Sequence, residues 1–255
     1  MDVEVLDPVG ARVTGVALSG TDPAALGALL AEHGVLVLPG QDAVDDDAFL
    51  AFLRAFGPPA FTAGETPLGT HPDLNVVSNV GRTTPPRSAF HVDTSYVAAP
   101  PAYTALRAVT VPERGGATQF SNQYRAYETL PEPLRARLDG RSIRHVVTGL
   151  PPGEAGAETE AWHPVFRPHP RTGRTALYLS TAARCAEVSG MDAAESAATV
   201  RELLGHSTRP DNVLDHRWAP GDVVIWDNAC VLHRADHSGV VGDRVMHRGM
   251  VRTHV

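Results

Sequence analysis

Lysine is absent from this chain. All 22 basic residues are arginine, which excludes any mechanism that needs a catalytic lysine. Cysteine is scarce as well, because Cys185 and Cys230 are the only two and they do not form a C-x-x-C pair. Two cysteines in 255 residues do not make a disulfide framework. A reducing, cytoplasmic location is therefore expected.

An excess of basic charge is also missing. The 22 basic residues face 29 acidic ones, a formal charge of −7, which argues against nucleic acid or an anionic membrane as partner. No stretch approaches 18 consecutive apolar residues, so no membrane span is expected. The opening residues MDVEVLDPVG contain two acids within the first four positions and no apolar run, so a signal peptide is not expected.

The sequence does contain many short β-type segments broken by Gly and Pro. Helices are expected at 22–34 and 45–57, because each begins with acidic residues and ends at glycine. Two short helices are expected within 123–139 and a longer one at 191–206. The predicted strands are one or two within 3–18, then 35–40, 74–80, 88–96, 103–110, 117–121, 142–148, 163–167, 175–180, 222–227, 229–234 and 244–253.

This pattern predicts an α+β fold with a mainly β core, a sandwich or barrel with flanking helices. No composition shift marks a boundary, so residues 1–255 are expected to form one domain. The segments 58–70 and 150–164 have no periodicity and are predicted loops that could serve as lids over a site. The oligomeric state stays open, and a homo-oligomer is one state that the sequence allows.

An H-x-D motif occurs twice, where chance alone gives roughly one. The copy at 71–73 contains Pro72, which cannot donate to a strand ladder, so a turn with its aspartate as a cap is expected. The copy at 91–93 lies among apolar residues that favour a strand.

A strand at 88–96 would place His91 and Asp93 on one face, with their Cα atoms about 6–7 Å apart. Two side chains so placed suit one metal ion. Burying the Asp93 charge needs a partner in any case, and a turn or a salt bridge are the alternatives to a metal.

A catalytic metal needs a third ligand, and His233 is the strongest candidate. It ends the second of two apolar strands in "PGDVVIWDNACVLHRAD". A lone histidine of this kind is more often a satisfied core residue, and His237 and His247 compete for the role.

Two arginines near the end of the chain need an anionic partner. Alternation along 244–253 places Arg244 and Arg248 on one face and His247 on the other. Salt bridges to acidic side chains would satisfy them, and so would an anionic ligand held by the guanidinium groups. Their Cα atoms would lie about 13 Å apart, so they could serve different charged groups.

These residues together resemble a known family. The order is H-x-D, then about 140 residues, then histidine, then arginine eleven and fifteen residues later, and it resembles the iron(II)/2-oxoglutarate dioxygenases of the taurine dioxygenase (TauD/TfdA) type. Three segments are similar to that family in the same order: "FHVDTSYVAAPPAYTALRAVTVPERGGATQFSN", "WHPVFRPHPRTGRTALYLS" and "WAPGDVVIWDNACVLHRADHSGVVGDRVMHRGMV".

The resemblance implies a double-stranded β-helix, or jelly roll, and an enzyme that oxidises a C–H bond while 2-oxoglutarate becomes succinate and CO2. His91, Asp93 and His233 would bind Fe(II), leaving positions for 2-oxoglutarate and O2. Thr118 and Arg244 would hold the distal carboxylate of 2-oxoglutarate. Arg248 would lie nearer the metal and the substrate.

The chain departs from the taurine enzyme at two positions near the expected site. Thr62 stands near the place of a sulfonate-binding histidine, and Arg87 stands where the taurine enzyme has a neutral polar residue. Taurine itself is therefore not the expected substrate. With Arg248, these residues predict a small anionic substrate: a carboxylate, phosphonate or sulfonate.

Three other functions use the same features. A desaturase or cyclase would share the iron chemistry. A zinc hydrolase or lyase could use the same three ligands but would not need Arg244 and Thr118. A non-catalytic jelly-roll binding module would leave the buried Asp93 unexplained.

Overall fold

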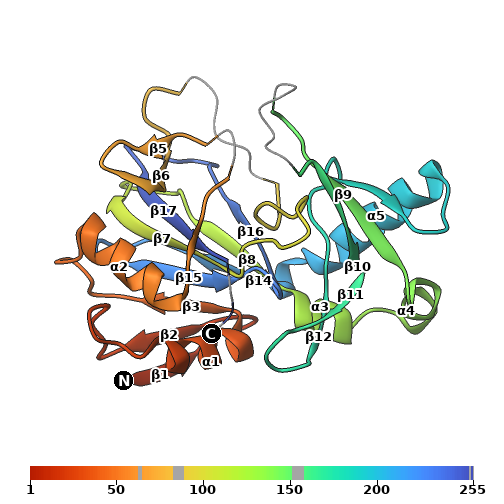
Figure 1. Ribbon diagram of the computed structural model, residues 1–255, viewed down its shortest axis with the longest axis horizontal. Helices are drawn as coiled ribbons and strands as arrows, with labels where there is room; N and C mark the ends of the chain where they lie inside the picture. Colours follow the sequence, from red (N-terminus) through yellow and green to blue (C-terminus); the bar gives the residue numbers. More distant parts are fainter. Residues whose placement is uncertain (63–64, 83–88, 151–157, 253, 255) are drawn as a thin grey trace.

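A nine-stranded sheet forms the larger layer of the protein (Figure 1). The computed structural model describes residues 1–62, 65–82, 89–150, 158–252 and 254. The strand order is β1-β2-β3-β15-β7-β17-β6-β5, and β4 pairs with β17. Every pairing is antiparallel except β2 with β3. The bounds are β1 Asp2–Val5, β2 Ala11–Thr14, β3 Val35–Leu38, β4 Pro59–Ala60, β5 Pro67–Leu68, β6 His71–Ser78, β7 Tyr103–Thr110, β15 Val223–Asp227 and β17 Val245–Val251.

A three-stranded sheet of order β14-β8-β16 forms the second layer of the jelly roll. Two smaller sheets, β10-β9-β13 and β11-β12, lie with α4 and α5 on the right of Figure 1. The bounds are β8 Thr118–Asn122, β9 Ser142–Val146, β10 Glu160–Pro164, β11 Phe166–Pro168, β12 Thr175–Leu177, β13 Cys185–Val188, β14 Val213–His216 and β16 Val231–Ala235. The helices are α1 Pro23–His33, α2 Asp46–Phe56, α3 Gln123–Glu128, α4 Glu132–Leu138 and α5 Ala193–Ser207, with the 3-10 turn η1 Pro210–Asn212.

At the centre of the large sheet, strand β15 is buried on both faces, which pack against different partners. On β15, Val223 and Ile225 belong to the cluster that includes apolar residues of α1 and α2. Val224 and Trp226 belong to a cluster with Phe120 of the second sheet. Alternate strand residues point to opposite faces, so one strand fills two cores, which explains why "VVIW" is apolar throughout.

The predicted helices are confirmed, and their caps explain where they begin. Asp22 accepts a hydrogen bond from Ala24 N, and Asp45 accepts one from Ala48 N. Each aspartate thereby satisfies a free amide of the first turn. No helix within the described ranges is long and apolar enough to cross a membrane. The prediction of a mainly β fold with flanking helices is also confirmed.

Three predictions of turns or loops were wrong. Residues 71–73 begin β6 instead of forming a turn, because Pro72 lies at the start of the strand, where a missing N–H does little harm. Residues 160–164, expected in a loop, form β10, which pairs with β9. The segment 58–70 contains the two-residue strands β4 and β5. The sequence reading also missed β13 and β14.

Candidate active site

His91 and His233 are brought together by a single β-bridge. The amide of each donates to the carbonyl of the other, at 3.0 Å in both directions. His233 lies in β16, but the predicted strand 88–96 is wrong. Residue 88 lies outside the described residues, and the chain beyond the bridge enters a turn at Asp93. The neighbouring apolar residues are buried by side-chain packing, such as Val92 in the core next to α4 and α5, and not by strand pairing.

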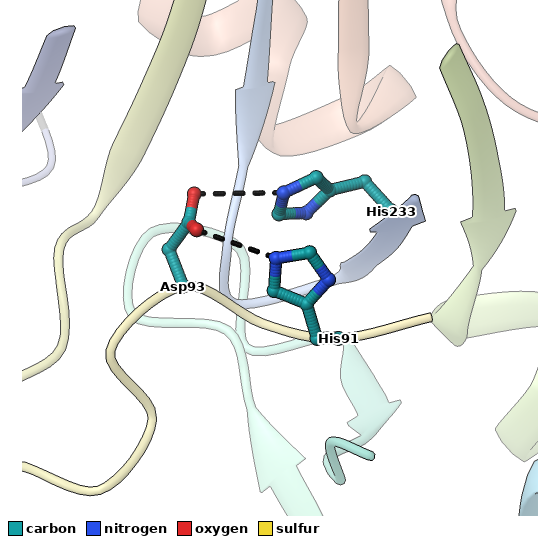
Figure 2. Close-up of side chains that lie close together, drawn as sticks. All are labelled: His91, Asp93 and His233. Atoms are coloured by element: carbon teal, nitrogen blue, oxygen red, sulfur yellow. Dashed lines mark ion pairs between the residues drawn. The ribbon is translucent and has the colours of Figure 1, made fainter. Parts of the chain in front are cut away.

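Asp93 faces both imidazole rings (Figure 2). His91 Nε2 lies 3.6 Å from Asp93 Oδ1, and His233 Nε2 lies 3.6 Å from Asp93 Oδ2. The three ligand atoms all lie within 4.8 Å of one another. His91 Nδ1 donates to the carbonyl of Ala89, which leaves its Nε2 lone pair directed at the cluster.

The protonation states of this cluster suit a metal ion. Burial lowers the pKa of His233 to about 3, and the nearby His91 ring adds to this effect. Burial alone would raise the pKa of the Asp93 carboxyl, but His233, Arg248 and His91 together hold that pKa well below its ordinary value. A neutral imidazole at His233 and an ionised carboxylate are the forms that bind metals.

A chain of hydrogen bonds fixes the Asp93 carboxylate. Thr104 Oγ1 donates to Asp93 Oδ2 at 2.8 Å, and Asn228 Nδ2 donates to Thr104 Oγ1 at 2.9 Å. All three side chains are buried. The sequence reading missed Thr104 and placed Asn228 only in a turn, because nothing local indicates that β7 lies beside this turn.

The turn that carries Asp93 is also held from the smaller sheet. His163 of β10 donates through Nε2 to the carbonyls of Ser95 and Val97, and His145 Nδ1 is hydrogen-bonded to Ser95 Oγ at 3.0 Å. Burial lowers the pKa of His145 to about 3 and lowers that of His163. Both rings are therefore neutral supports of the turn.

Arg244 is almost fully buried, at 1% exposure. Its Nε donates to the carbonyl of Gly116 and its Nη2 donates to Thr118 Oγ1, while Nη1 is buried without a hydrogen-bond partner among the described residues. Trp218 Nε1 donates to the same hydroxyl. Burial lowers the pKa of Arg244 to about 10, so the guanidinium stays charged. A buried guanidinium with an unsatisfied nitrogen can bind an anionic ligand by donating a hydrogen bond to it.

Arg248 lies in β17, four residues after Arg244, and its environment is different. Its Nε donates to Asn75 Oδ1 at 3.0 Å, and its Nη1 donates to Asp93 Oδ1 at 3.4 Å. Its Nη2 lies 3.1 Å from Glu65 Oε1. Arg248 is therefore already surrounded by carboxylates, unlike Arg244.

The two histidines and the two arginines line one cavity of about 360 Å³. Thr118 and Glu65 also line it, together with apolar side chains such as Trp226 and Leu106. A volume of this size lies within the range of small-molecule sites. The arrangement can therefore place a metal, a carboxylate bound at Arg244 and a small organic molecule side by side.

Comparison with known proteins identifies the family. The family model for "Taurine catabolism dioxygenase TauD, TfdA family" matches residues 2–250. The chain belongs to this family. It is 31% identical to the (S)-phenoxypropionate/alpha-ketoglutarate-dioxygenase of Sphingobium herbicidovorans, over 96% of this chain and 92% of the relative. It is 32% identical to the alpha-ketoglutarate-dependent sulfate ester dioxygenase of Pseudomonas putida, over 89% and 81%.

A solved structure supports the same assignment. The crystal structure of a taurine dioxygenase from Burkholderia xenovorans matches with a TM-score of 0.84 and 30% identity, over 98% of this chain and 90% of that one. The chain is therefore an enzyme, a 2-oxoglutarate-dependent dioxygenase with the TauD-like fold. The resemblance found in the sequence is confirmed.

The other residues predicted as site candidates differ in whether they lie near the His–Asp–His group. Thr62 Oγ1 lies 2.9 Å from Thr94 Oγ1, so it contacts the turn after Asp93. His247 lies on the opposite face of β17, where its Nδ1 is 2.6 Å from Asp46 of α2. His237 is not part of the His–Asp–His group. Arg87 lies outside the described residues.

A second buried group has similar side chains: His169, Asp227 and Cys230, whose potential ligand atoms also lie within 4.8 Å of one another. His169 Nδ1 accepts from the amides of residues 171 and 172, so its Nε2 carries the hydrogen and donates to Asp227 at 2.9 Å. Burial raises the pKa of the Cys230 thiol well above its ordinary value, which keeps it protonated. The group is thus satisfied by its own hydrogen bonds.

Proposed function

We propose that the dioxygenase binds Fe(II) through His91, Asp93 and His233 and hydroxylates a C–H bond of a small anionic substrate. The observation that carries the proposal is that these three ligand atoms meet within 4.8 Å of one another, where both histidines line the same cavity as Arg244, whose Nη1 has no hydrogen-bond partner among the described residues. Two histidines and one carboxylate are the ligand set of non-haem iron(II) oxygenases. Bound Fe(II), with 2-oxoglutarate and O2, supplies the oxidising chemistry that yields succinate and CO2.

The residues of the chain bind and orient the reactants. Arg244 and Thr118 hold the distal carboxylate of 2-oxoglutarate, since Nη1 of Arg244 finds no hydrogen-bond partner in the described ranges and a carboxylate would supply one. Thr104 and Asn228 keep the Asp93 carboxylate in place. Apolar walls, including Trp226 and Leu106, limit the access of water.

An anionic substrate is favoured by the relatives and by Arg248. The names of two relatives refer to phenoxypropionate and to sulfate esters, which are anions of different head-group chemistry. Arg248 lies beside the histidines in the cavity and can contact such a group. Thr62 and Arg87 complete the proposed substrate residues.

The single family match over residues 2–250 supports one domain, and the two free cysteines support a cytoplasmic location.

The test is oxygen uptake and succinate formation with purified enzyme, Fe(II) and 2-oxoglutarate. Phenoxypropionate, an alkyl sulfate and a library of small carboxylates serve as substrates, and products are read by mass spectrometry. A gain of one oxygen atom indicates hydroxylation, whereas a loss of two hydrogens indicates desaturation or ring closure. Substrate turnover that does not depend on Fe(II) or 2-oxoglutarate would contradict the proposal. Turnover with zinc alone would favour a hydrolase or lyase.

A further inference from the structure

One guanidinium nitrogen of Arg248 donates no hydrogen bond to any of the described residues. Its Nε and Nη1 donate hydrogen bonds to Asn75 and Asp93. Its Nη2 is buried and makes no hydrogen bond within the part of the chain that the structure describes, although Glu65 Oε1 lies only 3.1 Å away. Glu65 therefore pairs with Arg248 by charge and proximity but without the alignment of a hydrogen bond.

Of the three partners of Arg248 described above, Glu65 is the one whose side chain can move away from the guanidinium. Asn75 is 1% exposed and Asp93 is 4% exposed, and Asp93 is held by Thr104. The Glu65 side chain is 38% exposed. From the described residues, its other carboxylate oxygen accepts one long hydrogen bond, which Asn75 Nδ2 donates at 3.3 Å. A half-exposed ion pair of this kind is weak.

The position of Glu65 follows from the sheet register. Asn75 of β6 lies opposite Arg248 of β17 and also opposite Pro67 of β5. Glu65 comes two residues before Pro67, so pairing of β5 with β6 carries its carboxylate to the wall of the cavity that contains His91 and His233.

We propose that Glu65 occupies the place of the substrate's anionic group at Arg248 and that a carboxylate or sulfate on the substrate displaces it. This inference rests on the proposed anionic substrate and names the residue with which that substrate competes for Arg248. An incoming anion gains the hydrogen bond from Nη2 that Glu65 does not accept. The anion must first break the ion pair between Glu65 and Arg248 and overcome the repulsion between its own charge and that of Glu65. A neutral substrate gains nothing by displacing Glu65.

The experiment compares wild type with Glu65→Gln and with a matched control, Asp73→Asn. Asp73 also lies in this part of the sheet, pairs with Arg54 at 2.8 Å and is likewise 38% exposed, but it does not line the cavity. Both variants remove one negative charge. Calorimetry on enzyme with Fe(II) and 2-oxoglutarate, without oxygen, measures the binding of (S)-2-phenoxypropionate, its neutral methyl ester and hexyl sulfate.

Glu65→Gln is expected to bind the anions about two- to fivefold more tightly, the range of one half-exposed ion pair, with the ester unchanged and Asp73→Asn like wild type. Unchanged or weaker anion binding by Glu65→Gln, an equal gain in Asp73→Asn, or no anion binding by Glu65→Gln would each overturn the inference. The calorimetry needs no turnover, so loss of 2-oxoglutarate-dependent oxygen uptake would defeat the proposed function separately.

Discussion

His91, Asp93 and His233 on one side, and His169, Asp227 and Cys230 on the other, are two buried groups built from similar side chains. In both, the potential ligand atoms lie within 4.8 Å of one another. They differ in their hydrogen bonds. Asp227 accepts from His169 Nε2 at 2.9 Å, from His254 Nε2 at 3.1 Å and from an amide.

Asp93 instead faces two imidazole nitrogens at 3.6 Å, too far for hydrogen bonds. The first group therefore leaves lone pairs directed at a common point, while the second uses its donors and acceptors within the protein. Residue types and spacing are similar in the two groups, so the metal site proposed for the first group rests on the difference in hydrogen-bond partners.

The largest effect is expected from removing a ligand of the first group. His233→Ala should reduce coupled turnover to background, because two remaining ligands do not hold a catalytic metal well. The fold should survive, since His233 is neutral and gives up no ion pair at neutral pH. Oxygen uptake and circular dichroism check this together. Full activity would show that His233 is not a ligand and that His237 should be tested next.

Removing the acceptor of the second group should cost stability and leave chemistry intact. Asp227→Asn leaves an imidazole donor without its carboxylate, which costs about 2–4 kcal/mol of unfolding free energy. Denaturant unfolding measures the loss, and the 2-oxoglutarate-dependent activity of the folded fraction should match wild type. Loss of metal binding in folded Asp227→Asn would mean that the second group holds the metal.

A smaller effect is expected where a residue acts on the first group indirectly. Thr104→Val keeps the side-chain shape but removes the hydrogen bond to Asp93 Oδ2. Metal affinity should fall about 10- to 100-fold, as for other groups that orient a ligand. An anaerobic Fe(II) titration measures it, with the exposed Thr129→Val as control. Equal affinity in Thr104→Val and wild type would show that Asp93 does not need this support.

The smallest effect concerns the support of the Asp93 turn and its response to pH. The folded-state pKa of His145 is about 3, against an ordinary value of 6.5, so the unfolded chain takes up this proton first as pH falls. Stability from the neutral ring is complete above pH 6.5 and is lost toward pH 3, at about 1.4 kcal/mol per pH unit. Denaturant unfolding gives the free energy of unfolding at each pH between about 6 and 4. For His145→Asn, the slope of this free energy against pH should be smaller than the wild-type slope by that amount. An unchanged slope would contradict a buried neutral His145.

The sequence predicted much of the fold, because its helices have clear capping residues and its strands are apolar. Helix α1 at Pro23–His33 and strand β17 at Val245–Val251 lie within the predicted ranges. It failed at 88–96, where the apolar residues that favoured a strand are buried around a bridge and a turn. Burial makes a segment apolar whether or not the segment pairs as a strand.

Only part of the candidate site could be predicted from the sequence. The two histidines, Asp93 and Arg244 come from recognisable spacing and family resemblance. Glu65 does not, because it lies in a segment without periodicity and reaches Arg248 only through pairing of β5 with β6. Thr104 and His163 were missed for the same reason, since they act across contacts between strands far apart in the sequence.

The most direct test of the account is the stoichiometry of Fe(II) binding, titrated without oxygen in three proteins. Wild type and Cys230→Ser should each bind one equivalent, and His233→Ala should bind none with comparable affinity. One tight equivalent in His233→Ala, or its loss in Cys230→Ser, would contradict the assignment of the metal to His91, Asp93 and His233.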